Sequence, residues 1–572
     1  MMSALKKIDI TAYIPILHWL PRYDKSFIRW DLLAGVTLAF FVLPESMAYA
    51  TLAGVPTYYG IYCCLAGGLL FAIFTTAKHV AVGPTSSISL MIGSTVAVLS
   101  GGDLQRWAQI AELTALAVGG ICLLAFIFKL SSLINFISDS ILLGFKAGAA
   151  LSIMATQLPK LFGLHGSGSN FFTRMANLFS HLPGANWTVF VFGLCALIVL
   201  IAGDIFFHGK PISLLVVIAS ILVISFTHLS SAGVEVAGAI PNKLPTISRP
   251  SLRLTDINGV VELAFACFLM GYIETVSAAR TFAMKNNYLI NPRQELLALG
   301  AANFAAAFSS AYVVSGGLSQ STVNEASGAK TPMSIIICSG ALALILLFLA
   351  GYLSNLPEVI LAVIVLHAVS HLIKIKELKR VYTLNKMEFV VAMIALVGVL
   401  LLGILKGVML AVVMSLVLLI RKLSSPQVPI LGRVGNTPQY SDISRHPDNI
   451  VYVGISIQRV ESSILYFNAQ NIHDKINKNI AETGMPAHLI VLDFSAVPFI
   501  DIAGSSMLKR FLEQLKKDGA KVRITGALSN VRDLLRKQNV EEYTGHISRQ
   551  TSINEIVEAY RAENAKIFNS QN

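Results

Sequence analysis

Two short stretches, VAVGPTSSISL (residues 80–90) and YVVSGGLSQSTV (residues 312–323), decide the fold of this chain. In each, an extended glycine-bearing segment leads into an apolar run that is too short to cross a membrane as an ordinary helix. The two are the third and the tenth of fourteen apolar runs, so they hold matching positions in two halves of seven. Such interrupted runs are typical of transporters built from inverted repeats around a midplane site. The alternative is a pair of short buried helices without a ligand.

Working outward, the rest of the chain up to Arg421 indicates lipid as the solvent. Hydrophobic residues make up 54% of the 572 positions and charged residues 13%, a balance that one water-soluble core could not hide. Apolar runs near the length of about 20 residues that a spanning helix needs recur throughout. The runs are Asp31–Thr51, Tyr58–Phe74, Ser86–Leu99, Trp107–Phe128, Ile141–Leu158, Trp187–Ile205, Pro211–Phe226, Val260–Ala279, Arg293–Phe308, Ser319–Ala329, Pro332–Leu353, Pro357–His371, Lys386–Leu402 and Ile404–Leu423.

The net charge of +12 is explained by topology, so nucleic acid is not expected as a partner. Basic residues gather before the first run, in one late connection and after the last run. If spans alternate, these clusters share one side, which the positive-inside rule assigns to the cytoplasm. We expect a multi-pass protein of the inner (cytoplasmic) membrane with both termini cytoplasmic. The clustered residues are Lys6, Lys7, Arg22, Lys25, Arg29, Lys374, Lys376, Lys379, Arg380, Lys386, Arg421 and Lys422.

The composition changes after Pro426, where a Pro- and Gly-rich linker precedes a soluble tail. Strand-like runs such as HLIVLDFSAV alternate there with helical ones such as AGSSMLKRFLEQLKK, which indicates a small α/β domain. We place a cytoplasmic segment at 1–30, the transport domain at 31–424, the linker at 425–439 and the tail domain at 440–567. All six cysteines lie in apolar runs, so no disulfide framework is expected, and nothing calls for a cofactor.

The two short helices predict an anion site. A helix that begins inside the membrane presents unpaired N–H groups and the positive end of its dipole, which suits an anion that has lost its water. Hydroxyl groups accompany the first start, and glycines at the second allow the backbone to approach closely. Plain capping of the helix ends is the alternative. The predicted substrate-binding residues are Thr85, Ser86, Ser87, Gly316, Gly317, Leu318, Ser319 and Gln320, with Glu45.

Glu274, in LMGYIETVSAART, is the best candidate for the residue that binds the coupling ion. Acids inside apolar runs are costly and usually functional, and this one has small residues one turn to either side. A sodium ion would want more oxygens, yet position 278 is alanine, and Thr275 and Ser277 project to other faces. We therefore favour a coupled proton over sodium, with a structural hydrogen bond as the remaining alternative.

Most other polar residues in or near the runs are expected to be structural. Glu45 lies beside the helix-interrupting Pro44, and its role is open. Lys146, Glu295 and Asn303 are expected at helix ends or in hydrogen bonds between helices. The histidines His79, His367 and His371 show no companions at metal spacing, so no metal site is assigned.

These residues resemble the sulfate permease (SulP) family of anion transporters over almost the whole chain. The matching stretches include LPESMAYATLAGVPTYYGIY (residues 43–62), GYIETVSAARTFAMKNNYLINPRQELLALGAANFAAAF (271–308) and VSGGLSQSTVNEASGAKTPMS. The tail resembles a STAS domain through VLDFSAVPFIDIAGSSMLKRFLEQLKKDGAKVRITG (491–526). The resemblance implies fourteen spans in two inverted repeats of seven, split into core and gate domains as in uracil-permease-like proteins, followed by the STAS domain. A homodimer that works by movement of core against gate is also implied.

Three departures from the family pattern carry weight. Many relatives have Gln where this chain has Glu45 and Arg where it has Gln320, so each change makes the site more negative by about one charge when Glu45 is ionised. A divalent anion such as sulfate would then bind less readily unless protons accompany it, so proton-linked uptake, or a monovalent substrate such as bicarbonate or chloride, fits better than channel-like conduction. In the tail, Ala503 replaces the serine that related soluble proteins phosphorylate, which excludes a phosphoswitch there.

The leading hypothesis is proton-coupled symport of a small anion (sulfate, bicarbonate, chloride or a dicarboxylate). The rival within transport is a sodium-coupled bicarbonate symporter. A more distant alternative is a membrane sensor that signals through the STAS domain to a cytoplasmic protein partner. An enzyme is not expected, because no set of nucleophile, base and orienting group is evident in either domain.

Overall fold

The computed structural model describes residues 13–131, 138–164, 166, 168, 170–206, 212–227, 229, 232–238, 240–251, 253–482 and 487–564, apart from the side chains of Leu104 and Leu254. The chain divides into two compact units, Met1–Ser415 and Leu416–Asn572, and each is described by itself. Lys6 and Lys7 of the predicted basic cluster, Pro211 at the start of the seventh run and the last residues of the predicted tail domain, 565–567, lie outside the described residues.

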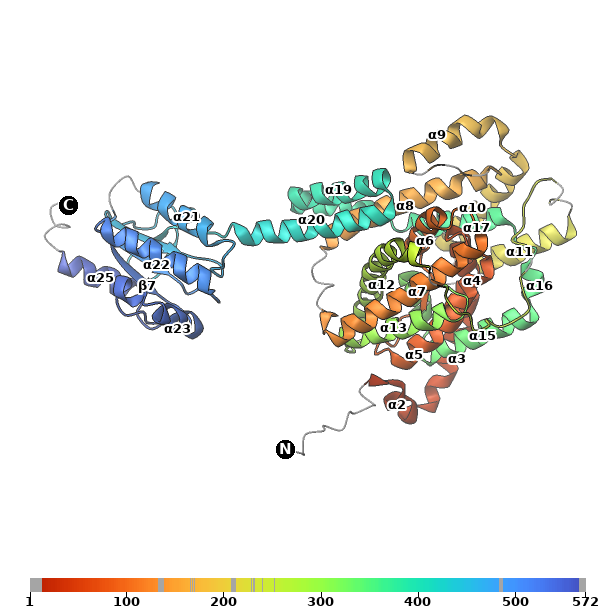
Figure 1. Cartoon of the computed structure of the whole chain (residues 1–572), viewed down its shortest axis with the longest axis horizontal. Coiled ribbons are helices and arrows are strands. Elements are labelled where there is room, and N and C mark those ends of the chain that lie inside the picture. Colours follow the sequence, from red (N-terminus) through yellow and green to blue (C-terminus); the bar gives the residue numbers. More distant parts are fainter. Residues whose placement is uncertain are drawn as a thin grey trace. The chain divides into compact units, whose positions relative to one another are not determined.

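The first half of the membrane unit is helical (Figure 1), and its helix α6 (Ser86–Leu99) follows a two-residue strand. Its elements are α2 (Ile16–Trp19), α3 (Ile28–Leu52), α4 (Thr57–Tyr62), a π-helical turn (Cys63–Gly67), α5 (Gly68–Phe74), β1 (Val82–Gly83), α6 (Ser86–Leu99), α7 (Leu104–Ile127), α8 (Asp139–Leu161), α9 (Phe171–His181), α10 (Trp187–Phe206) and α11 (Ile212–Phe226).

The second half repeats this order, again with a strand before its short helix. Its elements are α12 (Ile257–Lys285), α13 (Pro292–Ala307), β2 (Ser315–Gly316), α14 (Leu318–Ala326), α15 (Met333–Phe348), α16 (Ala350–Leu353), α17 (Glu358–Ser370), α18 (Ile375–Leu384), α19 (Lys386–Leu402) and α20 (Ile404–Ser424).

Each predicted apolar run corresponds to one helix or to consecutive helices, and the two short runs correspond to α6 and α14. Within the described residues, eight helical stretches are long and apolar enough to cross a membrane. Helices α9 and α18 were not predicted, because both are amphipathic and lie in connections that the hydropathy pattern reads as polar. The architecture is the expected helical membrane fold, and the number of true spans stays a prediction.

The helices of the membrane unit form two packed groups, which we call the core group and the gate group. In the core group, α13 packs on α7 and α5, α15 packs on α3, and α12 packs on α6, α7 and β2. In the gate group, α19 and α17 pack on α8, and α10 packs on α17. Both groups contain elements from each half of the chain, which is the arrangement that inverted repeats produce.

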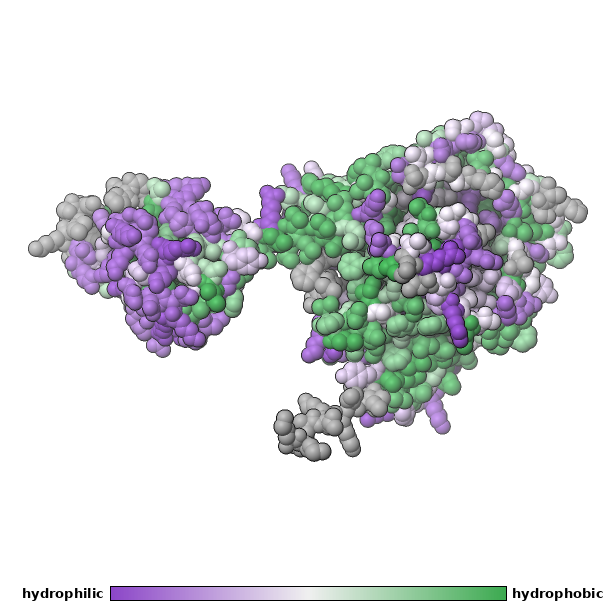
Figure 2. Space-filling view, viewed as in Figure 1, coloured by the Kyte–Doolittle hydropathy of each residue, from purple (hydrophilic) through white to green (hydrophobic). Residues whose placement is uncertain are grey.

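Apolar side chains cover the outside of this unit, as Figure 2 shows by the green surface over its helices. Val191, Ile198 and Ile205 of α10 and Val413 of α20 are all more than a third exposed. A soluble protein rarely exposes apolar surface on this scale, whereas a lipid environment favours it. The chain is therefore a multi-pass membrane protein.

The second unit is an α/β domain whose surface is mostly hydrophilic (Figure 2). Strands β5, β6 and β7 form a parallel sheet in that order, with Ile455 opposite Leu489 and Leu489 opposite Lys521. Parallel neighbours need crossovers, which α21 and α22 provide. The elements are β3 (Leu431–Arg433), β4 (Tyr440–Asp442), β5 (Ile455–Arg459), α21 (Ala469–Glu482), β6 (Leu489–Asp493), α22 (Ile502–Lys517), β7 (Lys521–Thr525), α23 (Ser529–Lys537), α24 (Glu541–Thr544) and α25 (Ile553–Glu563).

Helix α22 begins at the place where a phosphoswitch was excluded. Asp501 caps this helix by accepting a hydrogen bond from Gly504 N at 2.6 Å, and Ala503 is exposed in the first turn. Ser505 is buried and donates to Ile502 O at 3.0 Å, so its hydroxyl already has a partner.

Candidate functional site

A two-residue β ladder joins the starts of the two short helices. Val82 pairs with Gly316 and Gly83 pairs with Ser315, antiparallel, and Gly317 N donates to Ala81 O at 3.1 Å. Helices α6 and α14 begin immediately after these strands. The ladder therefore fixes two helix N-termini side by side, although they lie far apart in the sequence.

Glycine is required in this ladder because neighbouring backbone lies so close. A Cβ atom on Gly316 would sit 2.9 Å from Thr275 Cα, and one on Gly83 would sit 2.7 Å from Cys64 Sγ. Gly316 N also donates to Thr275 Oγ1 at 2.8 Å, which fastens β2 to α12. Gly316 thus attaches the wall of the site to α12 without lining the cavity, whereas Gly317 lines the cavity.

Neither helix start carries a side-chain cap among the described residues. Thr85, the N-cap of α6, accepts no hydrogen bond from the first turn through its hydroxyl group. Gly317, the N-cap of α14, has no side chain that could accept one. The first-turn N–H groups are therefore available to a ligand, and the helix dipoles add positive potential at the same place.

The two starts open on one cavity of about 380 Å³. The core group contributes one wall and the gate group contributes the other, through α8 and the end of α17. Of the predicted residues, all but Gly316 line it. The lining residues are Glu45, Tyr49, Pro84, Thr85, Ser86, Ser87, Asp139, Leu142, Leu143, Phe145, Lys146, Ala149, Glu274, Ser277, Ala278, Thr281, Gly317, Leu318, Ser319, Gln320, Ala368, His371, Leu372 and Lys374.

Glu274 of α12 is bonded to both helix starts. Its Oε1 accepts a hydrogen bond from Ser87 Oγ at 2.7 Å. Its Oε2 accepts from Thr85 Oγ1 and from Ser315 Oγ, both at 3.1 Å. Three hydroxyl donors thus hold the carboxyl group of this acid against the site.

Glu45 of α3 is less completely bonded. It is 5% exposed, and its Oε1 accepts from Tyr49 OH at 3.0 Å. In the described part of the chain, Glu45 Oε2 and Gln320 Oε1 have no hydrogen-bond partner, and Gln320 lies beside Glu45. Gln320 Nε2 donates to Pro84 O at 3.3 Å, which turns the amide oxygen away from that carbonyl. Two acceptors without donors therefore lie together at the start of α14.

Lys146 was expected to be structural, and this was wrong. It lies on α8 in the cavity wall and has no hydrogen-bond or ion-pair partner among the described residues. If all groups are ionised, the cavity lining carries three negative charges and two positive ones. The acids are Glu45, Asp139 and Glu274, and the bases are Lys146 and Lys374. The lysine offsets much of the negative charge that Glu45 and Gln320 introduce. No sequence period places it in the cavity, because the facing of α8 depends on its packing against α17 and α19.

Glu295 and Asn303 are structural as expected. Glu295 accepts from Thr75 Oγ1 at 2.7 Å and Thr76 Oγ1 at 2.6 Å, and Asn303 bonds both backbone groups of Val314. Thr275 projects away from Glu274 as expected, but Ser277 lines the cavity, contrary to expectation.

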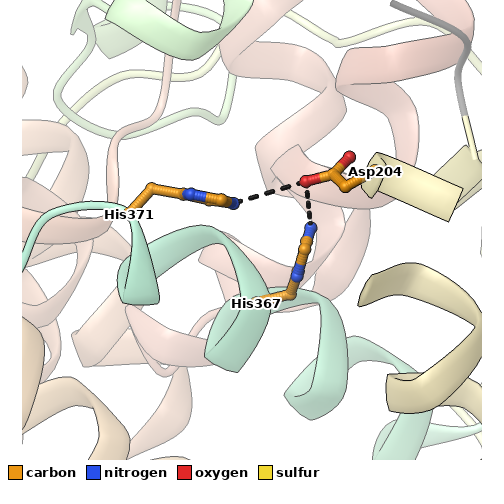
Figure 3. A group of neighbouring side chains, drawn as sticks. All are labelled: Asp204, His367 and His371. Carbon is orange, nitrogen blue, oxygen red and sulfur yellow. Dashed lines mark hydrogen bonds and ion pairs between the residues drawn. The ribbon is translucent and has the colours of Figure 1, made fainter. Parts of the chain in front are cut away.

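The expectation that His367 and His371 lack companions was also wrong. Asp204 at the end of α10 lies within ion-pair distance of both histidines (Figure 3). Sequence spacing could not reveal this carboxylate, because it belongs to a separate helix. His79 contacts Tyr288 and the carbonyl of Ala329.

Two protein-family models match separate parts of the chain. Residues 28–395 match the model of the sulfate permease family, and residues 446–552 match that of the STAS domain. A probable sulfate transporter of Mycobacterium tuberculosis is 26% identical over 539 residues, which cover 94% of this chain and 96% of that protein. Sulfate transporter 3.1 of Arabidopsis thaliana is 29% identical, with 96% and 87% covered.

Solved structures show the same fold. Murine solute carrier 26 member A9, an anion transporter in the inward-facing state, superposes with a TM-score of 0.88 at 22% identity, covering 98% of this chain and 96% of that one. The transmembrane domain of the cyanobacterial bicarbonate transporter BicA gives a TM-score of 0.61 at 18% identity, with 68% and 98% covered.

Proposed function

The chain belongs to the sulfate permease family of anion transporters, and from that membership we propose that it performs proton-coupled secondary active transport of a small inorganic or carboxylate anion. The carrying observation is the pair of uncapped helix starts that open on one cavity, opposite Lys146. Movement of the core group against the gate group would expose this cavity to each side of the membrane in turn.

The geometry supports an anion over a cation as the cargo. First-turn N–H groups and the Ser86 and Ser319 hydroxyls can replace the water around an anion, and the ammonium of Lys146 adds a full positive charge from the other wall. None of these groups selects a single anion, because they recognise charge and size. Sulfate, bicarbonate, chloride and dicarboxylates all remain within the proposal.

Glu274 explains why a proton would accompany the anion. The carboxyl group shares the cavity with the proposed anion, and two like charges 4 Å apart repel by about 4 kcal/mol at an effective dielectric constant of about 20. Even half of this repulsion, about 2 kcal/mol, changes an affinity about 30-fold. Protonation of Glu274 would remove the repulsion, so proton and anion each favour binding of the other, which is the requirement for symport.

A sodium-coupled bicarbonate symporter is the second candidate. The observation in its favour is Ser277, whose position on the cavity wall adds an oxygen near Glu274. Against it, Ala278 faces the same cavity and offers no ligand atom. The fold is shared with a bicarbonate transporter at 18% identity, and that likeness is one of fold alone.

Uptake of labelled anion into proteoliposomes under separate proton and sodium gradients tests the proposal. We expect an inward proton gradient to drive accumulation in the wild type, and Glu274→Gln to abolish that dependence while the protein still binds anion. If sodium alone drives uptake and Glu274→Gln leaves the response to protons unchanged, the coupling assignment fails. If no gradient or anion produces flux while a partner binds the STAS domain, the sensor alternative is favoured.

Location, assembly and partner extend this proposal. We propose the inner membrane as its location, with both termini in the cytoplasm, a homodimer as the working unit, and a cytoplasmic protein as the partner of the STAS domain. A detergent-corrected mass measurement tests the dimer, and protease access to the tail in sealed inverted vesicles tests the sidedness.

A further inference from the structure

A cluster of three ligand-type side chains lies at the end of α17, at the rim of the anion cavity. His367 Nε2 is 2.9 Å from Asp204 Oδ2, and His371 Nε2 is 3.4 Å from the same oxygen (Figure 3). The ligand atoms of all three residues lie within 4.8 Å of one another. Both histidines come from α17 and its C-cap, and the aspartate comes from α10.

The spacing of the two histidines fits one ion. Residues four apart on a helix lie on the same face, and a His pair at this spacing binds zinc on helices of other proteins. Zinc binds imidazole nitrogen at about 2.0–2.1 Å and carboxylate oxygen at about 2.0–2.2 Å, so ligand atoms around one tetrahedral ion lie a little over 3 Å apart. The three atoms already approach these separations, and small side-chain rotations would complete the site.

Ligand chemistry narrows the class of ion. Two imidazoles and one carboxylate suit zinc and its neighbours among the divalent transition metals, whereas magnesium and calcium prefer oxygen ligands alone. The exposed fraction of the side chain is 18% for His367, 51% for Asp204 and 64% for His371, and His371 opens on the cavity, through which an ion can reach the cluster.

We propose that Asp204, His367 and His371 form a binding site for a divalent transition cation of the zinc type, with water in the fourth position. The ion ties α10 to the end of α17 within the gate group. His371 also lines the anion cavity, three residues before Lys374. Binding therefore adds positive charge at the cavity rim and holds the end of α17 in place, so that metal occupancy regulates passage through the cavity.

Metal binding by the full-length chain, purified without a histidine tag, tests the site directly. We expect one equivalent of Co²⁺ to bind with the visible absorption of a four-coordinate ion, and Zn²⁺ to displace it. His371→Ala should weaken this binding more than about 10-fold, since even a residue behind a metal ligand costs 10–100-fold. Because His371 is exposed, its loss should leave the fold intact, which thermal unfolding checks.

His181→Ala is the matched control, because His181 is an exposed helix-end histidine of the same unit that lies outside the cluster. It should bind Co²⁺ as the wild type does. Absence of a saturable site, or equal binding by His371→Ala and the wild type, overturns the proposal. Asp204→Asn gives a second variant that keeps both imidazoles and should lose the four-coordinate spectrum.

A transport arm tests regulation, and it alone rests on the proposed function. Uptake by each protein with Zn²⁺ is divided by its own uptake without Zn²⁺. We expect a reduction of more than about 5-fold for the wild type and His181→Ala, and less than about 2-fold for Asp204→Asn. If Co²⁺ binds as described but this ratio is the same in all three proteins, the site exists and the regulatory part fails.

Discussion

The starts of α6 and α14 have the same backbone arrangement, a short strand followed by a helix, but they differ in how many hydrogen bonds the neighbouring acid accepts. At α6, hydroxyl groups of Thr85 and Ser87 donate to Glu274, whose two oxygens together accept three hydrogen bonds. At α14, Gln320 lies beside Glu45, and each leaves one buried oxygen without a donor in the described chain. The comparison shows that the first acid has donors on both of its oxygens, whereas the second pair lacks donors that a proton, a water or a ligand could supply.

The largest effect should come from breaking the ladder that both starts share. Gly316→Ala places a Cβ atom 2.9 Å from the backbone of Thr275, where nothing can yield cheaply. We expect a loss of stability of about 1–3 kcal/mol, typical of overpacking, together with loss of anion binding. Thermal unfolding in detergent and a binding isotherm measure the two effects.

Gly120→Ala on α7 is the matched control for the ladder. A Cβ atom at Gly120 would have no heavy atom within 4 Å, and Gly120 does not line the cavity. We expect anion affinity within about 3-fold of the wild type, a shift of less than about 0.7 kcal/mol. If both alanine substitutions lowered stability and anion binding equally, the close packing at Gly316 would not be what the site requires.

The next effect should come from the hydroxyl groups at α6. Ser87→Ala removes the 2.7 Å donor to Glu274, and a hydrogen bond to a charged group contributes about 1.5–3 kcal/mol. We expect proton-driven uptake to fall about 10- to 100-fold. Ser94→Ala on the same helix removes only a local bond to Met91 O and should leave uptake near the wild-type rate. Similar loss in both variants would contradict a special role for Glu274.

Lys146→Met tests whether the gate wall balances the charge of the two acids. Loss of one positive charge facing the anion should raise its dissociation constant about 5- to 30-fold, or about 1–2 kcal/mol, more strongly at low salt. Lys160→Met is the control, because Lys160 lies on the same helix but pairs with Glu358 at 3.3 Å. An unchanged dissociation constant in Lys146→Met would remove the lysine from the site.

The smallest effect should come from Glu45→Gln. An amide there can donate to the unpartnered oxygen of Gln320 and removes one negative charge from the cavity. We expect anion affinity to rise about 3- to 10-fold, about 0.7–1.4 kcal/mol, and to vary less with pH. Glu112→Gln is the control, since that acid bonds Ser248 and does not line the cavity. A fall in affinity would mean that Glu45 itself holds the ligand.

Much of the fold could be predicted from the sequence, because hydropathy and the two interrupted runs are local properties. The helix starts at residues 86 and 318 lie within one residue of the predicted runs. The hydrogen bond between Thr85 and Glu274 could not be predicted, because it depends on how α6 and α12 pack in the folded chain. The substrate-binding residues and the coupling role themselves stay predictions.

What escaped prediction depends on how helices face one another. Lys146 and His371 reach the cavity because α8 and α17 pack together in the gate group, and no single helix carries that information. Asp204 meets two histidines more than 160 positions away, as its 163-residue separation from His367 shows. Helices α9 and α18 were missed since hydropathy detects spans and ignores helices that lie in polar connections.

The β1–β2 ladder also constrains how the protein is made. Thr85 and Ser315 lie 230 positions apart, yet their hydroxyl groups meet beside Glu274. When α6 leaves the ribosome, the strand that will pair with β1 does not yet exist, so its backbone groups must wait in a membrane that offers no substitute partners. The ladder can close only after β2 has been synthesised, and the cavity wall only after α17 has followed it.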